Sequence, residues 1–172
     1  MRGGDIHIGP LMESDVAELV ALAREIWLAH YPAIIGMPQI EYMLAQRYSP
    51  AIVRGELHRR ELWWDQLRVG GAMAGFASYF LVSSDEMKLD KLYVHPRWQR
   101  RGYGGLMIER AAETARARGC DRLLLAVNKQ NQGAIAAYLK YGFRIAEATV
   151  KEIGSGFVMD DYIMVKPLVE QS

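Results

Sequence analysis

Residues 95–105, HPRWQRRGYGG, combine two residue types that can hold a phosphate, arginine and glycine. They lie between an apolar run, LYV, and a second run whose apolar residues have helical spacing, LMIERAAETARA. At such a junction the first N–H groups of the helix have no intrahelical partner, and the helix dipole places about half a positive charge there. Glycines let a polyphosphate approach this backbone without an intervening side chain. The stretch therefore predicts either an anion site or simply a tight turn.

The spacing excludes two common phosphate loops. A dinucleotide fingerprint requires G-x-G-x-x-G, but Met107 occupies the position of the last glycine. A P-loop requires Gly-Lys followed by Ser or Thr, and the sequence contains no such tripeptide. Neither loop explains the glycines.

A third pattern fits, and a second motif accompanies it. Gln99 to Gly104 (QRRGYG) matches Q/R-x-x-G-x-G/A, the signature with which the GNAT N-acetyltransferase superfamily binds the pyrophosphate of acetyl-coenzyme A. NQGAIAAYLKYGF, residues 131–143, resembles the family helix N-x-x-A-x-x-x-Y-x-x-x-G-F. LYVHP resembles the splayed strand that precedes the loop in this family. The chain thus resembles the GNAT superfamily over nearly its whole length.

The resemblance implies a fold and a reaction. The fold is α/β, a mixed sheet splayed at its centre with the order β-α-α-β-β-β-α-β-α-β-β, in a single domain over residues 1–172. The implied enzyme moves the acetyl group of acetyl-CoA to a primary amine by direct attack in a ternary complex. No metal is implied.

The resemblance also assigns the cofactor contacts. Backbone N–H groups of the glycine loop would hold the pyrophosphate, and the backbone of Leu92 and Val94 would pair with the pantetheine arm. The N–H of Val94 would face the acetyl carbonyl as oxyanion donor. Asn131 would either touch the pantetheine or cap its helix. The complete implied set is Leu92, Val94, Gln99, Arg100, Arg101, Gly102, Tyr103, Gly104, Gly105 and Asn131.

Tyr138 is the general acid that the resemblance implies. It lies seven residues after Asn131, two helical turns, so both side chains project from one helix face. The tyrosine would protonate the departing thiolate, although a packing role is the alternative. A thiol of pKa ~8.5 is already a fair leaving group, so the acid would assist without being indispensable.

The general base is harder to assign. An alkyl amine of pKa ~10.4 is mostly protonated at pH 7, and reaching the neutral form costs roughly 4.6 kcal/mol. Many GNAT enzymes place a glutamate on the fourth strand for this purpose, but the corresponding residue is Lys88. Asp90 and Glu86 lie two residues to either side and share its strand face. Either could act as base, and either could be an ordinary surface charge.

In this superfamily the first helices and the closing hairpin wall the acceptor pocket. Trp27 and Tyr31 come from the first segment, and Asp160 and Asp161 from the second. Carboxylates beside aromatic rings suit a cationic amine, but core aromatics and solvated acids are the alternative. AREIWLAHY and QIEYMLAQRYS also resemble, more loosely, relatives of polyamine acetyltransferases. A small, polyamine-like amine is the predicted acceptor.

Periodicity predicts the elements that must position these residues. A helix should follow Ser14 or Asp15 and stop before Pro32, and another should begin near Pro38. The stretch 49–57 signals only a further turn or two. Strands are expected at 6–9, 59–69, 70–84, 85–96 and 121–128 and in a closing hairpin from 143 to 168, with helices at 102–118 and 131–141.

Composition narrows the function classes. The net charge of +1 and the lack of a basic stripe argue against nucleic acid as a partner. One cysteine, Cys120, cannot form an internal disulfide, and the start, MRGGDIHIG, lacks a signal-peptide core. No apolar stretch approaches the ~20 residues of a membrane span. We expect a cytoplasmic protein without membrane partners, and a homodimer is one state that the sequence leaves open.

Two alternatives to small-amine acetylation remain. One is a peptide or protein N-acetyltransferase, although the sequence has no run of acids for docking basic tails. The other is a non-catalytic module that binds acyl-CoA as a sensor. Tyr138 argues against the sensor, and the missing strand glutamate argues for it.

Overall fold

The computed structural model describes residues 4–169, in which strands and helices follow the predicted order. The turn or two that the sequence signalled at 49–57 is present as α3, and three short 3-10 helices at 13–15, 31–33 and 96–98 were not predicted. The strands are β1 (Ile6–Pro10), β2 (Leu62–Val69), β3 (Ala72–Leu81), β4 (Glu86–Val94), β5 (Arg122–Asn128), β6 (Arg144–Gly154) and β7 (Phe157–Pro167). The helices are α1 (Val16–His30), α2 (Met37–Tyr48), α3 (Pro50–Leu57), α4 (Tyr103–Ala117) and α5 (Gln132–Lys140).

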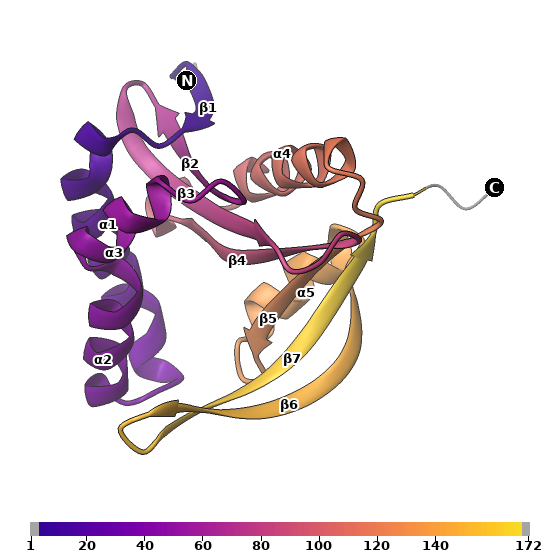
Figure 1. Ribbon diagram of the computed structural model, residues 1–172. Coiled ribbons are helices and arrows are strands. Elements are labelled where there is room, and N and C mark those ends of the chain that lie inside the picture. Colours follow the sequence, from indigo (N-terminus) through magenta and orange to yellow (C-terminus); the bar gives the residue numbers. More distant parts are fainter. Residues whose placement is uncertain (1–3, 170–172) are drawn as a thin grey trace. The chain divides into compact units, whose positions relative to one another are not determined.

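The strands form one mixed sheet in the order β1-β2-β3-β4-β5-β7-β6 (Figure 1). β4 and β5 are parallel, whereas β1–β2, β2–β3, β5–β7 and β6–β7 are antiparallel. The register of β4 with β5 covers only Glu86 to Lys88. The predicted mixed α/β fold is therefore confirmed.

The chain divides into two compact units, each with its own core. The first unit comprises residues 1–80 and 91–109. Its helices α1, α2 and α3 contact one another, and α3 also contacts β2. Its largest buried side chains include Trp27, Tyr48, Phe76, Leu19 and Ile40.

The second unit comprises residues 81–90 and 110–172, of which 81–90 and 110–169 are described. It contains the parallel start of β4, β5, α5 and the long β6–β7 hairpin. Met87, Leu123, Phe143 and Met164 are fully buried there. Within residues 4–169, no helix combines the length and apolar character that a bilayer span requires.

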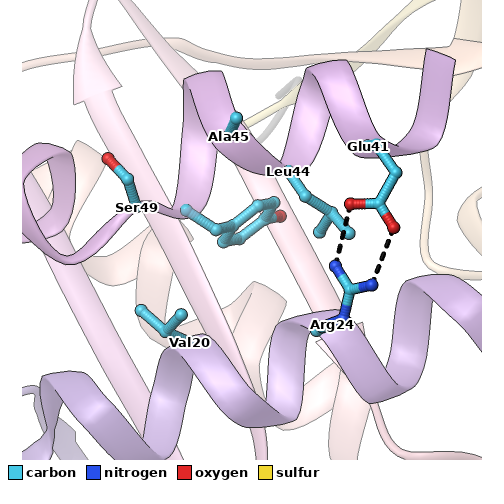
Figure 2. Close-up of a pocket in the computed structure, with 7 residues that line it drawn as sticks. Val20, Arg24, Glu41, Leu44, Ala45 and Ser49 are labelled. Carbon is cyan, nitrogen blue, oxygen red and sulfur yellow. Dashed lines mark hydrogen bonds and ion pairs between the residues drawn. The ribbon is translucent and has the colours of Figure 1, made fainter. Parts of the chain in front are cut away.

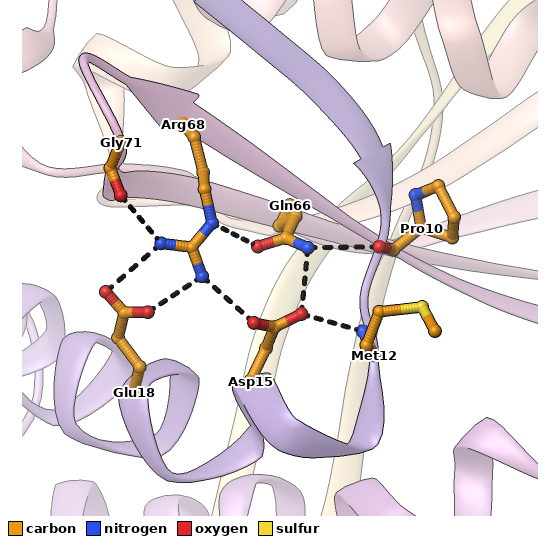
Figure 3. Close-up of polar contacts among 7 residues, drawn as sticks. All are labelled: Pro10, Met12, Asp15, Glu18, Gln66, Arg68 and Gly71. Carbon is orange, nitrogen blue, oxygen red and sulfur yellow. Dashed lines mark hydrogen bonds and ion pairs between the residues drawn. The ribbon is translucent and has the colours of Figure 1, made fainter.

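A polar network anchors the start of α1 to β2 (Figure 3). Asp15, predicted as a helix cap, accepts hydrogen bonds from the N–H of Met12 and the amide of Gln66, both at 2.9 Å. The guanidinium of Arg68 donates to Asp15 at 3.0 Å and to Glu18 at 2.8 Å. The bond to Glu18 is the largest cause that raises the pKa of Arg68. Asp15 thus occupies the N-cap position of α1, but its side chain makes no cap bond to that helix and instead binds Met12, Gln66 and Arg68.

A close backbone approach occurs where β3 passes the end of β4. The register of β2 with β3 shifts between Leu67 and Arg68, which oppose Gly75 and Met73, so Ala74 is the extra residue of a bulge. A Cβ on Gly75 would lie 2.5 Å from the carbonyl oxygen of Tyr93. Because that contact is with backbone, a side chain here would push β3 and β4 apart.

We therefore expect Gly75→Ala to lower the free energy of unfolding by ~1–3 kcal/mol, the usual cost of overpacking. Chemical denaturation measures the change. Gly55→Ala in α3 is the matched control, since a Cβ there meets nothing within 4 Å. Its stability should stay level or rise by up to ~1 kcal/mol. Equal effects of the two substitutions would contradict this account of the bulge.

Candidate functional site

The last residues of β4 turn two peptide N–H groups away from β3. The N–H of His95 donates to the carbonyl of Ala74 in β3 at 2.8 Å, and the carbonyl of Tyr93 also faces β3, beside Gly75. Peptide directions alternate along a strand, so the N–H groups of Leu92 and Val94 point to the opposite edge of β4. An extended ligand can pair with such an edge in the manner of an added strand.

Gln99 ties the following loop to this strand. Its side-chain amide donates to the carbonyl of Val94 at 2.9 Å. Gln99, the first residue of the QRRGYG motif, was predicted to contact the cofactor. In the structure this bond joins it to the end of β4. Its structural role is to set the distance between strand and loop.

The loop backbone has the shape of an anion-binding concavity. The angle φ is +63° at Arg100 and +82° at Gly102, whereas Arg101 between them is not in the positive region. Alternating backbone handedness of this kind directs successive N–H groups toward one point. The bond from the N–H of Leu106 to the carbonyl of Gly102 starts α4, so the N–H groups just before it have no intrahelical acceptor.

Gly104 leaves this concavity open. A Cβ built on Gly104 would meet nothing within 4 Å, so the protein itself does not require a glycine there. A bound phosphate would require it, because a side chain would occupy the space in front of the N–H groups.

The arginines of the loop differ in how they are held. The guanidinium of Arg101 lies 5.2 Å from the ring centroid of Trp98, and that of Arg97 lies 5.6 Å from the same ring. Both are cation–π distances. Arg100 is exposed. Trp98 thus orients two positive charges beside the loop, a role that the sequence did not reveal.

His95 links the end of β4 to α1 and was also missed. Its Nδ1 accepts from the N–H of Arg97 at 3.1 Å, and its Nε2 lies 2.9 Å from a carboxylate oxygen of Glu25. In the neutral ring an accepting Nδ1 places the proton on Nε2, which then donates to Glu25. This pair of bonds fixes the short 3-10 turn Pro96–Trp98 that begins the loop.

Lys91 is a buried cation inside the first unit. Its side chain is 3% exposed, and its Nζ lies 3.7 Å from a carboxylate oxygen of Glu56 in α3. The ammonium also lies 4.9 Å from the ring centroid of Trp64 and 5.6 Å from that of Tyr48. Ion pair and rings together compensate for the burial of the charge. Nothing in the local sequence distinguishes this lysine from an exposed one.

The structure separates the two candidate bases. Asp90 is 18% exposed and lies 3.9 Å from Lys88, the residue in the usual glutamate position. Glu86 lies 3.8 Å from Arg122, at the other end of the strand. At ~3.3 Å per residue, Glu86 lies roughly 20 Å from Leu92, whereas Asp90 is only two residues away from it.

Trp27 and Tyr31 belong to an aromatic cluster of the first unit. Trp27 is 2% exposed, and its ring centroid lies 4.3 Å from that of Tyr31, 5.7 Å from that of Tyr48 and 5.9 Å from that of Tyr93. The hydroxyls of Tyr31 and Tyr93 are 2.8 Å apart. Trp27 is therefore a core side chain in this structure, and Tyr31 is the partly exposed member next to it.

Asp160 and Asp161 lie within β7 rather than in its turn. Neighbouring residues of a strand point to opposite faces, so the two carboxylates do not form a pair. Asp160 is exposed and makes an ion pair with Lys129. Asp161 is 4% exposed and lies opposite Asn128 and Thr149 in the sheet register.

Tyr138 lies within α5, and Asn131 is the residue at its N-cap position. Asn131 precedes the helix, but its side chain makes no cap bond, which removes the pure capping role. The ring of Tyr138 packs edge-on against Phe143 with centroids 5.6 Å apart. Loss of hydration around its hydroxyl raises the pKa of Tyr138 from 10.0 to about 12. The phenol is thus a proton donor throughout the neutral range.

A surface depression between α1 and α2 is lined by Tyr48, an aromatic of the segments expected to wall the acceptor pocket, but not by Trp27, Tyr31, Asp160 or Asp161 (Figure 2). It holds about 480 Å³ of empty space, including open solvent. Arg24 and Glu41 form a two-bond ion pair at its edge, at 2.9 and 2.7 Å. The hydrogen bonds from Arg24 lower the pKa of Glu41. Among residues 4–169, His, Cys, Asp and Glu side chains form no group of three that could hold a metal ion.

Comparison with known proteins gives consistent results. The family model for the GNAT acetyltransferases matches residues 20–143. The chain is 26% identical to the spermidine N(1)-acetyltransferase of Thermoplasma acidophilum, over 90% of this chain and 96% of the relative. It is 31% identical to an uncharacterised N-acetyltransferase of Mycobacterium tuberculosis, over 91% and 99% of the two chains.

A solved structure has the same fold. The PaiA N-acetyltransferase of Thermoplasma acidophilum, crystallised in complex with coenzyme A, superposes with a TM-score of 0.82 at 24% identity. The match covers 95% of this chain and 99% of that one.

Proposed function

This chain belongs to the GNAT acetyltransferase family and is an acetyltransferase, and we propose that it transfers the acetyl group of acetyl-CoA to a small primary amine of the polyamine class. The observation that carries the proposed acceptor is the similarity, over nearly the whole of both chains, to a spermidine N(1)-acetyltransferase. The cosubstrate is supported by the loop geometry and by the fold shared with a protein crystallised with coenzyme A.

Backbone groups bind acetyl-CoA in this proposal. The N–H groups from Arg100 to Gly105 hold the pyrophosphate, with Arg101, oriented by Trp98, adding positive charge. The edge of β4 at Leu92 and Val94 pairs with the pantetheine amides. The side chain of Asn131, which makes no helix-cap bond, contacts the pantetheine arm.

Chemistry follows by direct attack. The neutral amine nitrogen forms a bond to the acetyl carbon, and the C–S bond then breaks as electrons pass to sulfur. The N–H of Val94 stabilises the oxyanion, a role worth ~2.7–4 kcal/mol per donor. Tyr138 provides a proton to the departing thiolate. Since its pKa of about 12 exceeds that of a free thiol (~8.5), its contribution is hydrogen bonding in the transition state more than complete proton transfer.

Asp90 is the base that we favour over Glu86. A general base must lie within hydrogen-bond reach of the proton that it accepts, or within one water molecule of it. Asp90 is two residues from Leu92 and largely buried, whereas Glu86 is at the far end of β4 beside Arg122. A water between Asp90 and the ammonium completes the transfer.

Replacing the two acids separately tests this assignment. Asp90→Asn should lower kcat/KM for the amine at neutral pH by about a hundredfold, the lower range of general-base effects. The loss should shrink as pH approaches the pKa of the amine, because the substrate then arrives neutral. Glu86→Gln should leave the pH–rate profile unchanged. If both variants match the wild type, the base lies elsewhere.

Acetylation of an amine panel tests the function itself. Thiol release from acetyl-CoA should be fast with polyamines, slower with simple monoamines and slowest with peptides carrying a free N-terminus. Mass spectrometry of the product identifies the acetylated nitrogen. Rapid acetylation of peptides without turnover of any polyamine would establish a peptide acceptor instead. Binding of acetyl-CoA without thiol release from any amine would identify a sensor.

A further inference from the structure

β6 is an unusually exposed strand at the end of the sheet. It is the last strand in the order, and β7 is its only strand neighbour within residues 4–169. Nine of its 11 residues, Arg144 to Gly154, are exposed, and only Thr149 and Ile153 are intermediate. Both faces of the strand are therefore exposed over most of its length, and Figure 1 shows it running beside β7. Proteins usually shorten, bend or cover such an edge, because its backbone groups pair readily with another strand.

The regular part of this edge is well defined. Register shifts with β7 leave Ala146 and Ile153 as extra residues, so residues 147–152 form an uninterrupted segment between two bulges. Val150 in this segment is 65% exposed, although valine is an apolar residue. Between the two bulges the edge therefore presents a regular, partly apolar template rather than a purely charged one.

The sequence of this segment is complementary to itself. Two identical antiparallel strands related by a two-fold axis must place one residue opposite its own copy. With Thr149 opposite Thr149, Glu147 of each chain lies opposite Lys151 of the other. These residues share one face, because residues directly opposite one another point to the same side. On the other face Ala148 lies opposite Val150, so apolar residues meet apolar residues.

Neighbouring registers lose this match. Centring on Ala148 places Ile145 opposite Lys151, and centring on Val150 places Ala148 opposite Glu152. Neither arrangement brings Glu147 against Lys151. Opposite charges placed directly across two strands stabilise their pairing. Centring on Ala148 would bring Arg144 opposite Glu152, but Arg144 lies beyond the bulge at Ala146. Within the regular segment 147–152, the register centred on Thr149 is the one that provides two such pairs.

We propose that the β6 edge binds a second copy of this chain, with the two β6 strands antiparallel and centred on Thr149. The arrangement continues the sheet across the two-fold axis, buries Val150 of both chains and forms two ion pairs between Glu147 and Lys151. The interface lies on residues that have no assigned part in acetyl transfer.

Charge reversal tests the register as well as the association. Sedimentation equilibrium over a concentration series should show a dimer for the wild type. In Lys151→Glu, both pairs between the two chains become pairs of acids, Glu147 opposite the new glutamate. The dissociation constant of the dimer should therefore rise at least tenfold. Glu147→Lys combined with Lys151→Glu restores opposite charges in the same register, and should return most of the affinity. Lys140→Glu, at an exposed position of α5, is the control with the same charge change and should dimerise like the wild type.

The outcomes separate this interface from its alternatives. A monomeric wild type at all concentrations would overturn the proposal, as would a Lys151→Glu dimer of undiminished affinity. A double variant as weak as Lys151→Glu would refute the centring on Thr149. Thermal unfolding of each variant, measured at a concentration where the wild type is monomeric, should coincide with that of the wild type because the substituted side chains are exposed.

Discussion

Gly104→Val is expected to abolish the binding of acetyl-CoA while leaving the protein folded. A Cβ added at Gly104 would meet nothing within 4 Å, so we expect the protein to fold with the substitution. Because a helical Cβ tilts toward the N-terminus of its helix, we expect a branched side chain at this position to cover the N–H groups of the first turn of α4 and to keep a phosphate out of hydrogen-bond reach. We expect affinity to fall at least about a hundredfold, which corresponds to ~2.8 kcal/mol.

Calorimetric titration with acetyl-CoA measures the loss, and circular dichroism checks the fold. Gly55→Val is the matched control, because Gly55 is also a helical glycine whose added Cβ meets nothing within 4 Å. Its affinity for acetyl-CoA should equal that of the wild type.

Arg100→Ala provides a ranking within the loop. Arg100 is exposed, and a single screened surface charge contributes little, so the affinity should fall only roughly two- to fivefold. If the arginine substitution weakened binding more than the glycine substitution, side chains rather than backbone N–H groups would hold the pyrophosphate.

Tyr138→Phe is expected to lower kcat by about tenfold to a hundredfold and to leave the affinity for acetyl-CoA unchanged. The lost group is a hydrogen-bond donor to sulfur in the transition state, and the thiolate is a fair leaving group without it. The ring of phenylalanine keeps the contact with Phe143, so stability at neutral pH should be preserved. Single-turnover kinetics with saturating amine separate this effect from binding.

The pH dependence of the wild type follows from the same tyrosine. Its pKa of about 12 means that the neutral phenol, the donating form, persists well above pH 10. The rate should therefore show no alkaline decline from Tyr138 until pH approaches 12, provided that the protein remains folded. A decline in rate near pH 10 that disappears in Tyr138→Phe would contradict the raised pKa. If kcat of Tyr138→Phe equalled that of the wild type, the role of Tyr138 would be packing alone.

Much of the fold could be predicted because its signals are local. Apolar periodicity and Pro38 predicted α1 and α2, and the alternating runs predicted the strands. The weakly signalled turn or two at 49–57 is α3, whose eight residues make about two turns and contact α1, α2 and β2. Asp15 was predicted as a cap from its type, but Arg68 and Gln66, distant in sequence, hold its side chain instead.

The candidate site shows the same contrast between features set by local sequence and features set by contacts distant in sequence. Motif spacing alone identified the loop from Gln99 to Gly105 and the α5 pair Asn131 and Tyr138. Spacing could not show that Asp160 and Asp161 lie inside β7 and face opposite ways, because that depends on where the hairpin turns. Sequence spacing also could not choose between Asp90 and Glu86 as the base, because both lie two residues from Lys88. They differ in their ion-pair partners, Lys88 for Asp90 and Arg122 for Glu86.

The sequence by itself determined the family, the order of the elements and the glycine loop, because backbone handedness and helix starts depend on neighbouring residues. Only the tertiary structure decided which charges are buried and which peptide groups are turned outward. Lys91 meets Glu56, and His95 meets Glu25, across long stretches of chain. Such contacts follow from the register of strands and the packing of helices, and no local pattern of residue types encodes either of them.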